Sequence, residues 1–430
     1  MVNTKDNVAT ATPSHMTGST HHKTIWYAPH KFEAYGEEEI KAVEECLRDG
    51  WLAPGPRTNM FEDCVAKYFG KQYGIFVNSG SSANTLSLLM AGLNAGDEVI
   101  TPACTFSTTV APLMQLSLKP VFCDVETRKF VPSVQQVLSV LTPNTKALFI
   151  PNLAGSKPDW KGLRSELKKL GRADVFLIED SCDTMTYTEE SDLSVISFYA
   201  SHVITAGGGG GMVMCNSAEQ RALGMQYRDW GRIGTNAEDP SARFGHEIDG
   251  IPYDFKFLYG VVGYNFKSTE MNAAFGLVQM EKLPTFLEIR RRNVNRYIER
   301  LSRETPLILP EDDGSINWLA FPALVPESWR RQDLLQYIES RGIQTRVFFA
   351  GNVTRHPAYR MYFDESNPNK FANADTIMRN CFMLGAHHGL TLEDIDYVCD
   401  VIRDFASSKT NVVILPTSSA LVDNNDACDL

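Results

Sequence analysis

The sequence predicts an α/β protein: a large domain built on a mainly parallel sheet, followed by a smaller α+β C-terminal domain. Between residues 73 and 214, short β-rich runs alternate with helical segments. These runs are nearly continuous in apolar residues, which is typical of parallel strands covered on both faces. After about residue 303 the order changes to strand, helix and strand, which indicates the second domain.

Seven runs in the large domain fit strands. They are Tyr73–Asn78, Glu98–Thr101, Pro120–Val125, Lys146–Pro151, Val175–Asp180, Val195–Tyr199 and Gly211–Met214. Before them, Ile40, Val43 and Leu47 have helical spacing, and Gly50 predicts the end of that helix.

A long charged helix is expected over Leu283–Arg303, with Pro284 in its first turn. The smaller domain then shows a strand, a helix, a strand and a last helix: Asn317–Val325, Arg331–Arg341, Gln344–Phe349 and Leu392–Phe405. We therefore divide the chain into a disordered leader (1–25), an N-terminal segment (26–60), the large domain (61–285), the small domain (286–407) and a polar tail (408–430).

Composition excludes several classes of function. The chain has 430 residues, 43% of them hydrophobic, and a formal net charge of -11, which disfavours binding to nucleic acid or to an anionic membrane surface. It has no long apolar segment and no secretory signal, so we expect a cytoplasmic protein. Nine scattered cysteines without a C-x-x-C pair predict reduced thiols and no metal site.

A turn of small residues follows the first strand. Ser79-Gly80-Ser81-Ser82 leads into a helical face of Leu86, Leu89, Met90 and Leu93. Free N–H groups and the helix dipole at such a start favour a phosphate. On its own the signal is weak, because many strand-to-helix turns use glycine and serine only to turn and cap.

Two further features follow in chain order. Val175–Asp180 ends in Glu179-Asp180, where a carboxylate could keep a pyridine nitrogen protonated, although a solvated strand-end acid is equally consistent. The segment 197–205 comes next, and the glycine run 207–211 after it lacks G-x-G-x-x-G spacing, so it indicates a tight backbone passage. Together they have the order of a pyridoxal-phosphate site, with His202 where the Schiff-base lysine belongs.

That histidine limits the chemistry. An imidazole cannot condense with the cofactor aldehyde, because only a primary amine does so, but it can transfer protons near neutral pH. The chain is thus either a damaged aminotransferase or an enzyme for acid–base work on an amine-form cofactor.

Residues 31–407 resemble the DegT/DnrJ/EryC1/StrS sugar aminotransferases of the aspartate-aminotransferase fold (fold type I), and most closely their nucleotide-sugar 3-dehydratase branch, in which histidine replaces the lysine. Seven motifs in the same order carry the resemblance: Asn78-Ser-Gly-Ser-Ser-Ala-Asn84, Thr105-Phe-Ser-Thr-Thr-Val110, Glu179-Asp-Ser-Cys-Asp183, Ser197-Phe-Tyr-Ala-Ser-His202, Arg228-Asp-Trp-Gly-Arg232, Gly263-Tyr-Asn-Phe-Lys267, and Phe349-Ala-Gly-Asn352 with Thr354-Arg355.

The resemblance implies a role for each matching residue. The cofactor phosphate would be held by Gly80, Ser81 and Ser197, with Asn265 of the partner subunit of a homodimer. The ring would be held by Phe106, which stacks on it, by Asp180 at its nitrogen and by Asp183 near its hydroxyl. His202 would be the base, and Arg346, Asn352 and Arg355 would reach the nucleotide diphosphate or the sugar.

The implied reaction removes the C3 hydroxyl of a nucleotide-linked 4-keto-6-deoxyhexose. Pyridoxamine 5'-phosphate would condense with the 4-keto group, and His202 would take a proton from the cofactor and help the C3 hydroxyl to leave. One branch type needs an iron–sulfur cluster and a reductase; the other regenerates the amine from L-glutamate. Cys182 matches one cluster cysteine, but the segment after Trp230 supplies none of the others, so we expect the glutamate route without a cluster.

Some features leave alternatives open. The Arg228–Arg232 insert is closer to the cluster-bearing type, and Val203, Gly208 and the short loop between Asp183 and Ser197 depart from the branch pattern. Two other hypotheses stand beside the dehydratase. One is an aminotransferase that recruits another amine, such as Lys267, and the other is a non-catalytic protein of the same fold.

Overall fold

The computed structural model describes residues 23–30, 33–234 and 239–410. Its large sheet has seven strands in the order β1-β7-β6-β5-β4-β2-β3. Their bounds are β1 Tyr73–Val77, β2 Glu98–Pro102, β3 Lys119–Cys123, β4 Thr145–Pro151, β5 Phe176–Asp180, β6 Leu193–Ser197 and β7 Gly211–Cys215. Only β7 runs antiparallel to its neighbours, β1 and β6. The predicted α/β class and the mainly parallel sheet are therefore confirmed.

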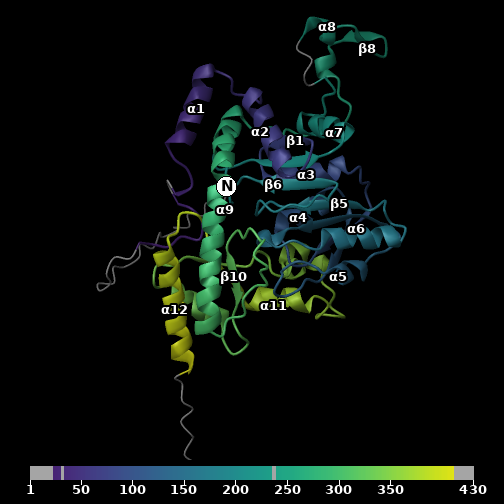
Figure 1. Ribbon diagram of the computed structural model, residues 1–430. Coiled ribbons are helices and arrows are strands. Elements are labelled where there is room, and N and C mark those ends of the chain that lie inside the picture. The colour runs from purple at the N-terminus through teal and green to yellow at the C-terminus, as the bar shows by residue number, and fades with distance from the viewer. Residues whose placement is uncertain (1–22, 31–32, 235–238, 411–430) are drawn as a thin grey trace, which may run out of the picture.

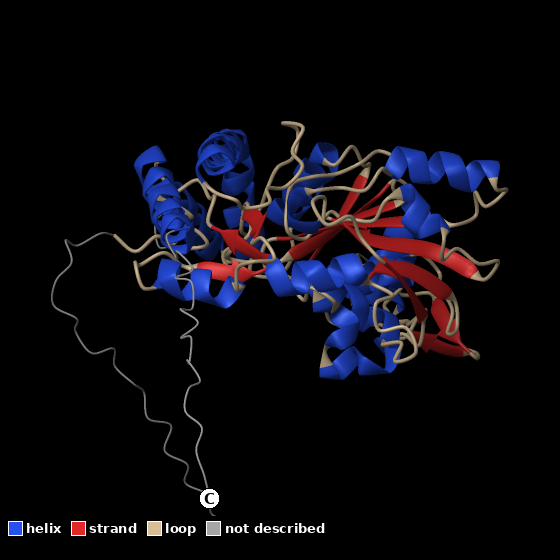
Figure 2. Cartoon of the chain, turned by 90° about the horizontal axis from the view of Figure 1, so that it is seen from below, coloured by secondary structure: helices blue, strands red, loops and turns tan. Residues whose placement is uncertain are grey.

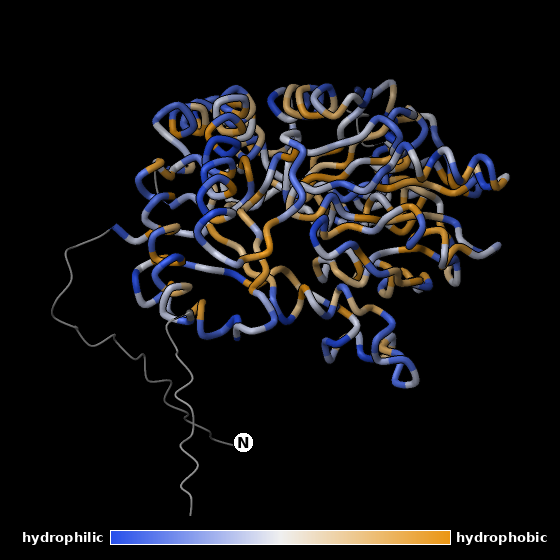
Figure 3. The backbone as a smooth tube through the Cα atoms, turned by 60° about the horizontal axis from the view of Figure 1, so that its bottom comes forward, coloured by the Kyte–Doolittle hydropathy of each residue, from blue (hydrophilic) through white to orange (hydrophobic). Residues whose placement is uncertain are grey.

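Helices cover both faces of this sheet (Figure 2). Successive residues of β4 show why: Ala147 and Phe149 pack with α3 (Gly80–Met90) and α4 (Ser107–Gln115), whereas Leu148 and Ile150 pack with α5 (Val134–Leu138) and α6 (Trp160–Lys169). The strands lie as apolar segments between more polar helices in Figure 3. A strand buried on both faces needs a continuous apolar run, which is the pattern that the sequence shows.

The helix α9 (Glu270–Glu304) connects the two parts of the molecule (Figure 1). It packs against α1 (Glu37–Asp49) and α2 (Pro56–Tyr68) near its start and against α12 (Leu392–Thr410) near its end. The prediction placed its start at Leu283, which is wrong. The Thr269 hydroxyl caps the helix by accepting from the Asn272 N–H, and Pro284 lies inside it.

The smaller sheet has the order β10-β12-β11, with all pairs antiparallel. Its strands are β10 (Phe321–Leu324), β11 (Thr345–Val347) and β12 (Cys381–Leu384), and the helices α10 (Arg331–Glu339) and α11 (Ala372–Asn380) flank them. The sequence analysis missed α11 and the central strand β12. That strand has four residues and follows α11 directly, so no turn signal separates the two.

The ends of the chain need two corrections. Residues 1–22 and 411–430 lie outside the described residues, but Ile25, predicted in the leader, is buried and pairs with Ile343. Residues 408–410, predicted in the tail, belong to α12. The helix predicted before Gly50 is confirmed as α1, because Gly50 adopts the left-handed conformation at its end.

Between α7 (Ala218–Arg228) and α9 the chain forms a projecting arm, seen at the top of Figure 1. It contains α8 (Pro240–Arg243) and a hairpin of β8 (His246–Ile248) and β9 (Ile251–Tyr253). Among the described residues, none of the helices combines the length and the apolar character of a membrane span.

Candidate active site

A cavity of about 440 Å³ opens at the carboxyl ends of β4, β5 and β6, between the large and small sheets. Ligands of open α/β sheets bind at this edge. The structure brings eight of the sequence-predicted site residues to its lining: Gly80, Ser81, Phe106, Asp180, Asp183, Ser197, His202 and Arg346.

One end of the cavity is the start of α3. The Ser79 side chain caps this helix by accepting from the Ser82 N–H at 3.1 Å. A Cβ atom on Gly80 would lie 2.5 Å from the Cβ atom of Ser197, so only glycine fits there. Gly211, in the glycine run, is equally constrained, because its Cβ would lie 2.4 Å from the Ser79 carbonyl oxygen. The predicted tight passage is confirmed, and it brings the glycine run against the start of α3, where the first N–H groups of a helix have no partner within the helix.

Asp180 lies at the end of β5 and is 4% exposed. Its Oδ2 atom accepts hydrogen bonds from Asn84 Nδ2 at 2.9 Å and from Thr109 Oγ1 at 2.8 Å, and its Oδ1 atom accepts from the Cys182 N–H. A carboxylate held by three donors has a fixed orientation. It is therefore no solvated strand-end acid.

Asp183 lies on the same wall of the cavity. Burial raises the pKa of this carboxyl to about 7, and the nearby Asp180 charge adds to the rise, while the N–H of Ala154 lowers it. Asp183 therefore holds a proton readily near neutral pH.

His202 sits in the loop after β6, with its Nδ1 atom 3.3 Å from the Ser197 carbonyl oxygen. Burial lowers the pKa of this imidazole to about 4, against smaller opposing effects of the Ser197 carbonyl and Asp180. The ring is therefore neutral at pH 7. With its proton on Nδ1 it donates to Ser197, and Nε2 keeps a free lone pair.

Other parts of the cavity lining are aromatic and basic. Phe106 is 49% exposed and meets Phe349 edge-on at 6.4 Å between ring centroids, which leaves ring surface available inside the cavity. Arg346, on β11, lies over the Tyr27 ring at 5.4 Å from its centroid. Its guanidinium has no carboxylate within ion-pair distance among the described residues.

Two predicted substrate residues are not brought to the cavity lining. Asn352 is 1% exposed; its side chain donates to Asp375 Oδ1 at 2.7 Å and caps the short helix Val353–Arg355. Arg355 forms an ion pair with the same Asp375 carboxylate. Both side chains are used for local structure in the small domain, so neither lines the cavity.

Asn265 and Lys267 also lie outside the cavity lining. Asn265 is exposed and pairs through its main chain with Asp229, so its predicted role needs a second subunit. The Lys267 ammonium is 3.3 Å from Asp229 Oδ2 and lies over the Trp230 ring. This lysine is not placed to replace the missing amine within its own subunit.

Several cavity residues were not singled out from the sequence. Asn84 and Thr109 stand inside quoted motifs, and their polar side chains could have been matched to the buried carboxylate. Tyr199 also stands inside a quoted motif, Ser197–His202, whereas Tyr27 gave no signal, because it lies outside every motif.

The residues present fit a pyridoxal-type cofactor. The Gly80 cradle at a helix start suits a phosphate, the fixed Asp180 carboxylate suits a ring nitrogen, and the open Phe106 face suits a flat ring. Among the described residues, no group of three or more His, Cys, Asp and Glu side chains could hold a metal ion.

Comparison with known proteins decides the family. The sequence profile of the DegT/DnrJ/EryC1/StrS aminotransferase family matches residues 33–403. The chain belongs to this family. The aspartate-aminotransferase-like fold predicted for it is thereby confirmed, and the solved structures described below share it.

Two curated members of the family are each 33% identical to this chain. The lipopolysaccharide biosynthesis protein RfbH of Salmonella typhimurium aligns over 88% of this chain and 91% of its own length. The dTDP-4-dehydro-2,6-dideoxy-D-glucose 3-dehydratase of Saccharopolyspora spinosa aligns over 87% and 85%. Among solved structures, the GDP-4-keto-6-deoxy-D-mannose-3-dehydratase of E. coli with bound hydrated PLP is 26% identical, with a TM-score of 0.78 over 88% of this chain and 100% of that one.

Proposed function

We propose that this protein is a nucleotide-sugar 3-dehydratase that removes the C3 hydroxyl of a nucleotide-linked 4-keto-6-deoxyhexose. One observation carries the proposal: His202 occupies the cavity at the end of β6, and no lysine is among the described residues that line it. An aminotransferase needs such an amine, whereas a dehydratase needs a proton carrier.

Pyridoxal 5'-phosphate in its amine form, pyridoxamine 5'-phosphate, would supply an electron sink next to the sugar. In this proposal Gly80, Ser81 and Ser197 hold its phosphate. Phe106 packs on its ring and Asp180 holds a positive charge at the ring nitrogen. Asp183, whose pKa is raised to about 7, presents a proton near the ring hydroxyl.

His202 is the proton carrier in this mechanism. The Nδ1 proton of the ring is directed to the Ser197 carbonyl oxygen. The Nε2 atom is therefore the one that accepts the proton transferred in the reaction. Because burial keeps the free ring neutral, the proton is held only briefly and is passed to the departing C3 oxygen. Arg346 donates from Nη1 to the Thr345 carbonyl oxygen at 2.7 Å and uses its other donors to bind an anionic or oxygen-rich part of the substrate.

The relatives support this substrate class. Two of the proteins described above are named as 3-dehydratases, one of a dTDP-linked and one of a GDP-linked deoxysugar. The nucleotide base stays open, because the two relatives differ in it.

The proposal includes L-glutamate as the amino donor and no iron–sulfur cluster. The positions of the cysteines support the absence of a cluster. Cluster ligation takes four thiolates, but Cys182 is the only cysteine at the cavity in the part of the chain that the structure describes, and residues 230–262 contain no cysteine. The proposal also includes a cytoplasmic homodimer in which Asn265 of one subunit completes the phosphate site of the other.

A direct assay tests the proposal. The protein is loaded with pyridoxamine 5'-phosphate and incubated with L-glutamate and either GDP-4-keto-6-deoxymannose or dTDP-4-keto-6-deoxyglucose. We expect mass spectrometry to show that at least one sugar has lost one oxygen atom, because its C3 hydroxyl is replaced by hydrogen while L-glutamate is oxidised to 2-oxoglutarate and its nitrogen is released as ammonia. Replacement of the keto oxygen by an amino group, with the C3 hydroxyl retained, would indicate an aminotransferase, and no product from either sugar would favour a non-catalytic protein.

A further inference from the structure

Tyr27 reaches the cavity from the N-terminal end of the chain. The strand-like segment before it is fixed to the small domain, because the Ile25 N–H donates to the Gly342 carbonyl and the Tyr27 N–H donates to the Gln344 side chain at 3.1 Å. A Cβ atom on Gly385 would lie 2.5 Å from the Trp26 carbonyl oxygen. The position of the Tyr27 ring is therefore determined by close packing.

The phenol of Tyr27 is poorly satisfied. Among the described residues its one hydrogen-bond partner is the Met383 sulfur, at 3.7 Å, and a thioether is a weak acceptor. Three other tyrosines with little exposure, Tyr68, Tyr297 and Tyr359, each donate to a main-chain carbonyl oxygen. Tyr27 is partly buried and lines the cavity, so its hydroxyl keeps a donor for a group that binds there.

The groups around the Tyr27 phenol indicate which kind of ligand would bind there. Burial raises the pKa of the Tyr27 phenol well above its usual value, so the group stays protonated and donates. Arg346 lies over its ring, and Arg290 nearby is 2% exposed with Nε and Nη2 lacking partners. Arg290 is not part of the cavity lining, but the Tyr27 phenol and the Arg346 guanidinium both are, beside the Asp183 carboxyl. This corner therefore presents hydrogen-bond donors and a positive charge, which favour an oxygen-rich ligand.

We propose that the Tyr27 hydroxyl donates a hydrogen bond to a hydroxyl oxygen of the bound sugar and so fixes how the hexose lies in the cavity. The inference rests on the proposed nucleotide-sugar substrate. It adds to the site a binding residue from the N-terminal segment, a part of the chain for which we inferred no ligand contact from the sequence.

The test uses Tyr27→Phe, which removes one oxygen atom and keeps the ring. Binding of GDP-mannose and dTDP-glucose, which carry a hydroxyl in place of the reactive ketone, is measured by calorimetry on the protein loaded with pyridoxamine 5'-phosphate. Loss of one neutral hydrogen bond should weaken binding by about fivefold to tenfold. Tyr68→Phe, which removes a phenol outside the cavity, is the matched control and should leave the affinity unchanged.

Each outcome decides a different point. Equal affinities for Tyr27→Phe and the wild type would overturn the role of Tyr27 and leave the substrate class intact. If the wild type bound neither probe, the proposed substrate class would fail, and the inference with it. The absorbance of the bound cofactor and the melting temperature, measured for each variant, show whether Tyr27→Phe has disturbed the fold; if it has, Tyr27→Leu is measured in its place.

Discussion

His202 is the residue on which the proposed proton transfer depends. Replacing it with asparagine keeps a hydrogen-bonding side chain of similar reach but removes the group that accepts and returns the proton. We expect His202→Asn to lower kcat by roughly 10²–10⁴-fold, which is the usual range for loss of a general acid–base group. Cofactor binding, followed by absorbance, should remain. The control is His30→Asn, an exposed histidine outside the cavity lining; undiminished turnover in His202→Asn would exclude the mechanism.

Asp183 makes stability depend on pH. Its pKa is about 7 in the folded protein and about 4 when the chain unfolds, so the folded state binds the proton more tightly. Stability is therefore lost as pH rises from about 4 to about 7, by up to about 1.4 kcal/mol per pH unit.

Asp183→Asn removes this titration. In the cofactor-free protein we expect the substitution to raise the melting temperature more at pH 8 than at pH 5. Asp63→Asn, an exposed change on α2, should have the same small effect at both pH values. A larger gain for Asp183→Asn at pH 5 than at pH 8 would mean that the carboxyl is ionised throughout.

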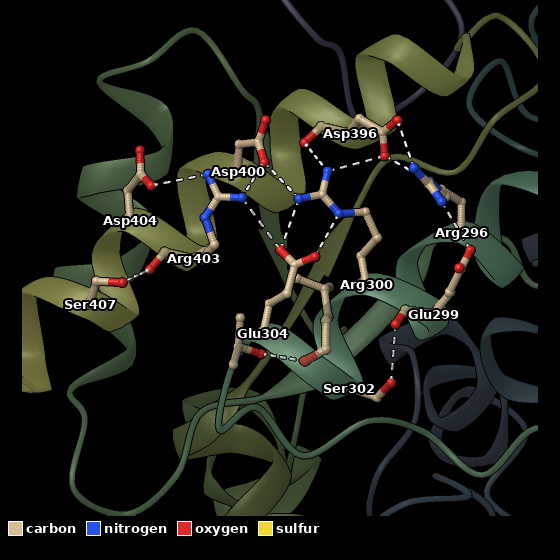
Figure 4. A network of polar contacts seen from close by, with 12 residues as sticks. Arg296, Glu299, Arg300, Ser302, Glu304, Asp396, Asp400, Arg403, Asp404 and Ser407 are labelled. Carbon is tan, nitrogen blue, oxygen red and sulfur yellow. Dashed lines mark hydrogen bonds and ion pairs between the residues drawn. The ribbon is translucent and has the colours of Figure 1, made fainter.

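Among the elements, α9 and α12 are connected by a network of ion pairs (Figure 4). Arg300 is at its centre: its Nη2 atom is 2.8 Å from Glu304 Oε2 and 2.6 Å from Asp400 Oδ1, and its Nη1 atom is 3.2 Å from Asp396 Oδ1. The Arg300 bond lowers the pKa of Glu304, and the bond from Arg296, with a smaller contribution from Arg300, lowers the pKa of Asp396. A shared, mostly covered guanidinium is worth more than an isolated surface pair.

We expect Arg300→Ala to lower the free energy of unfolding by roughly 1–2 kcal/mol, and the loss to shrink in high salt. Denaturant unfolding at low and high salt measures it. The control is Arg303→Ala, because the Arg303 side chain is 76% exposed and makes one long contact, at 3.9 Å, with Glu299. Equal effects of the two substitutions would show that the network adds nothing.

The individual helices and strands also show how much of the structure could be predicted from the sequence. The strands of the large sheet were predictable because burial on both faces demands apolar runs, and the motifs at their ends brought seven of the predicted residues to one cavity, which Arg346 joins from β11. The start of α9 was not, because Pro284 suggested a first turn where the helix simply continues. The contacts of Asn352 and Arg355 could not be predicted for a different reason: Asp375, their partner, is 20 or more residues away in the sequence.

At the scale of the whole molecule, the arm leaves apolar side chains uncovered. Val262 is 94% exposed and Ile251 is 63% exposed, and Phe244, Tyr253 and Tyr259 are also exposed. Asn265 lies at the base of this arm, outside the cavity of its own subunit. Uncovered apolar surface beside a predicted site residue favours a symmetric dimer, in which each arm reaches the other subunit.

Mixing two inactive variants tests this arrangement. His202→Asn and Asn265→Ala should each be weakly active alone, because every site of either dimer carries one substitution. In a mixed dimer one site carries both substitutions and the other carries neither. After unfolding and refolding together, an equal mixture should regain about a quarter of wild-type activity, since half of the dimers are mixed and half of their sites are intact. If Asn265 served its own subunit, every site would keep one substitution and no activity would return.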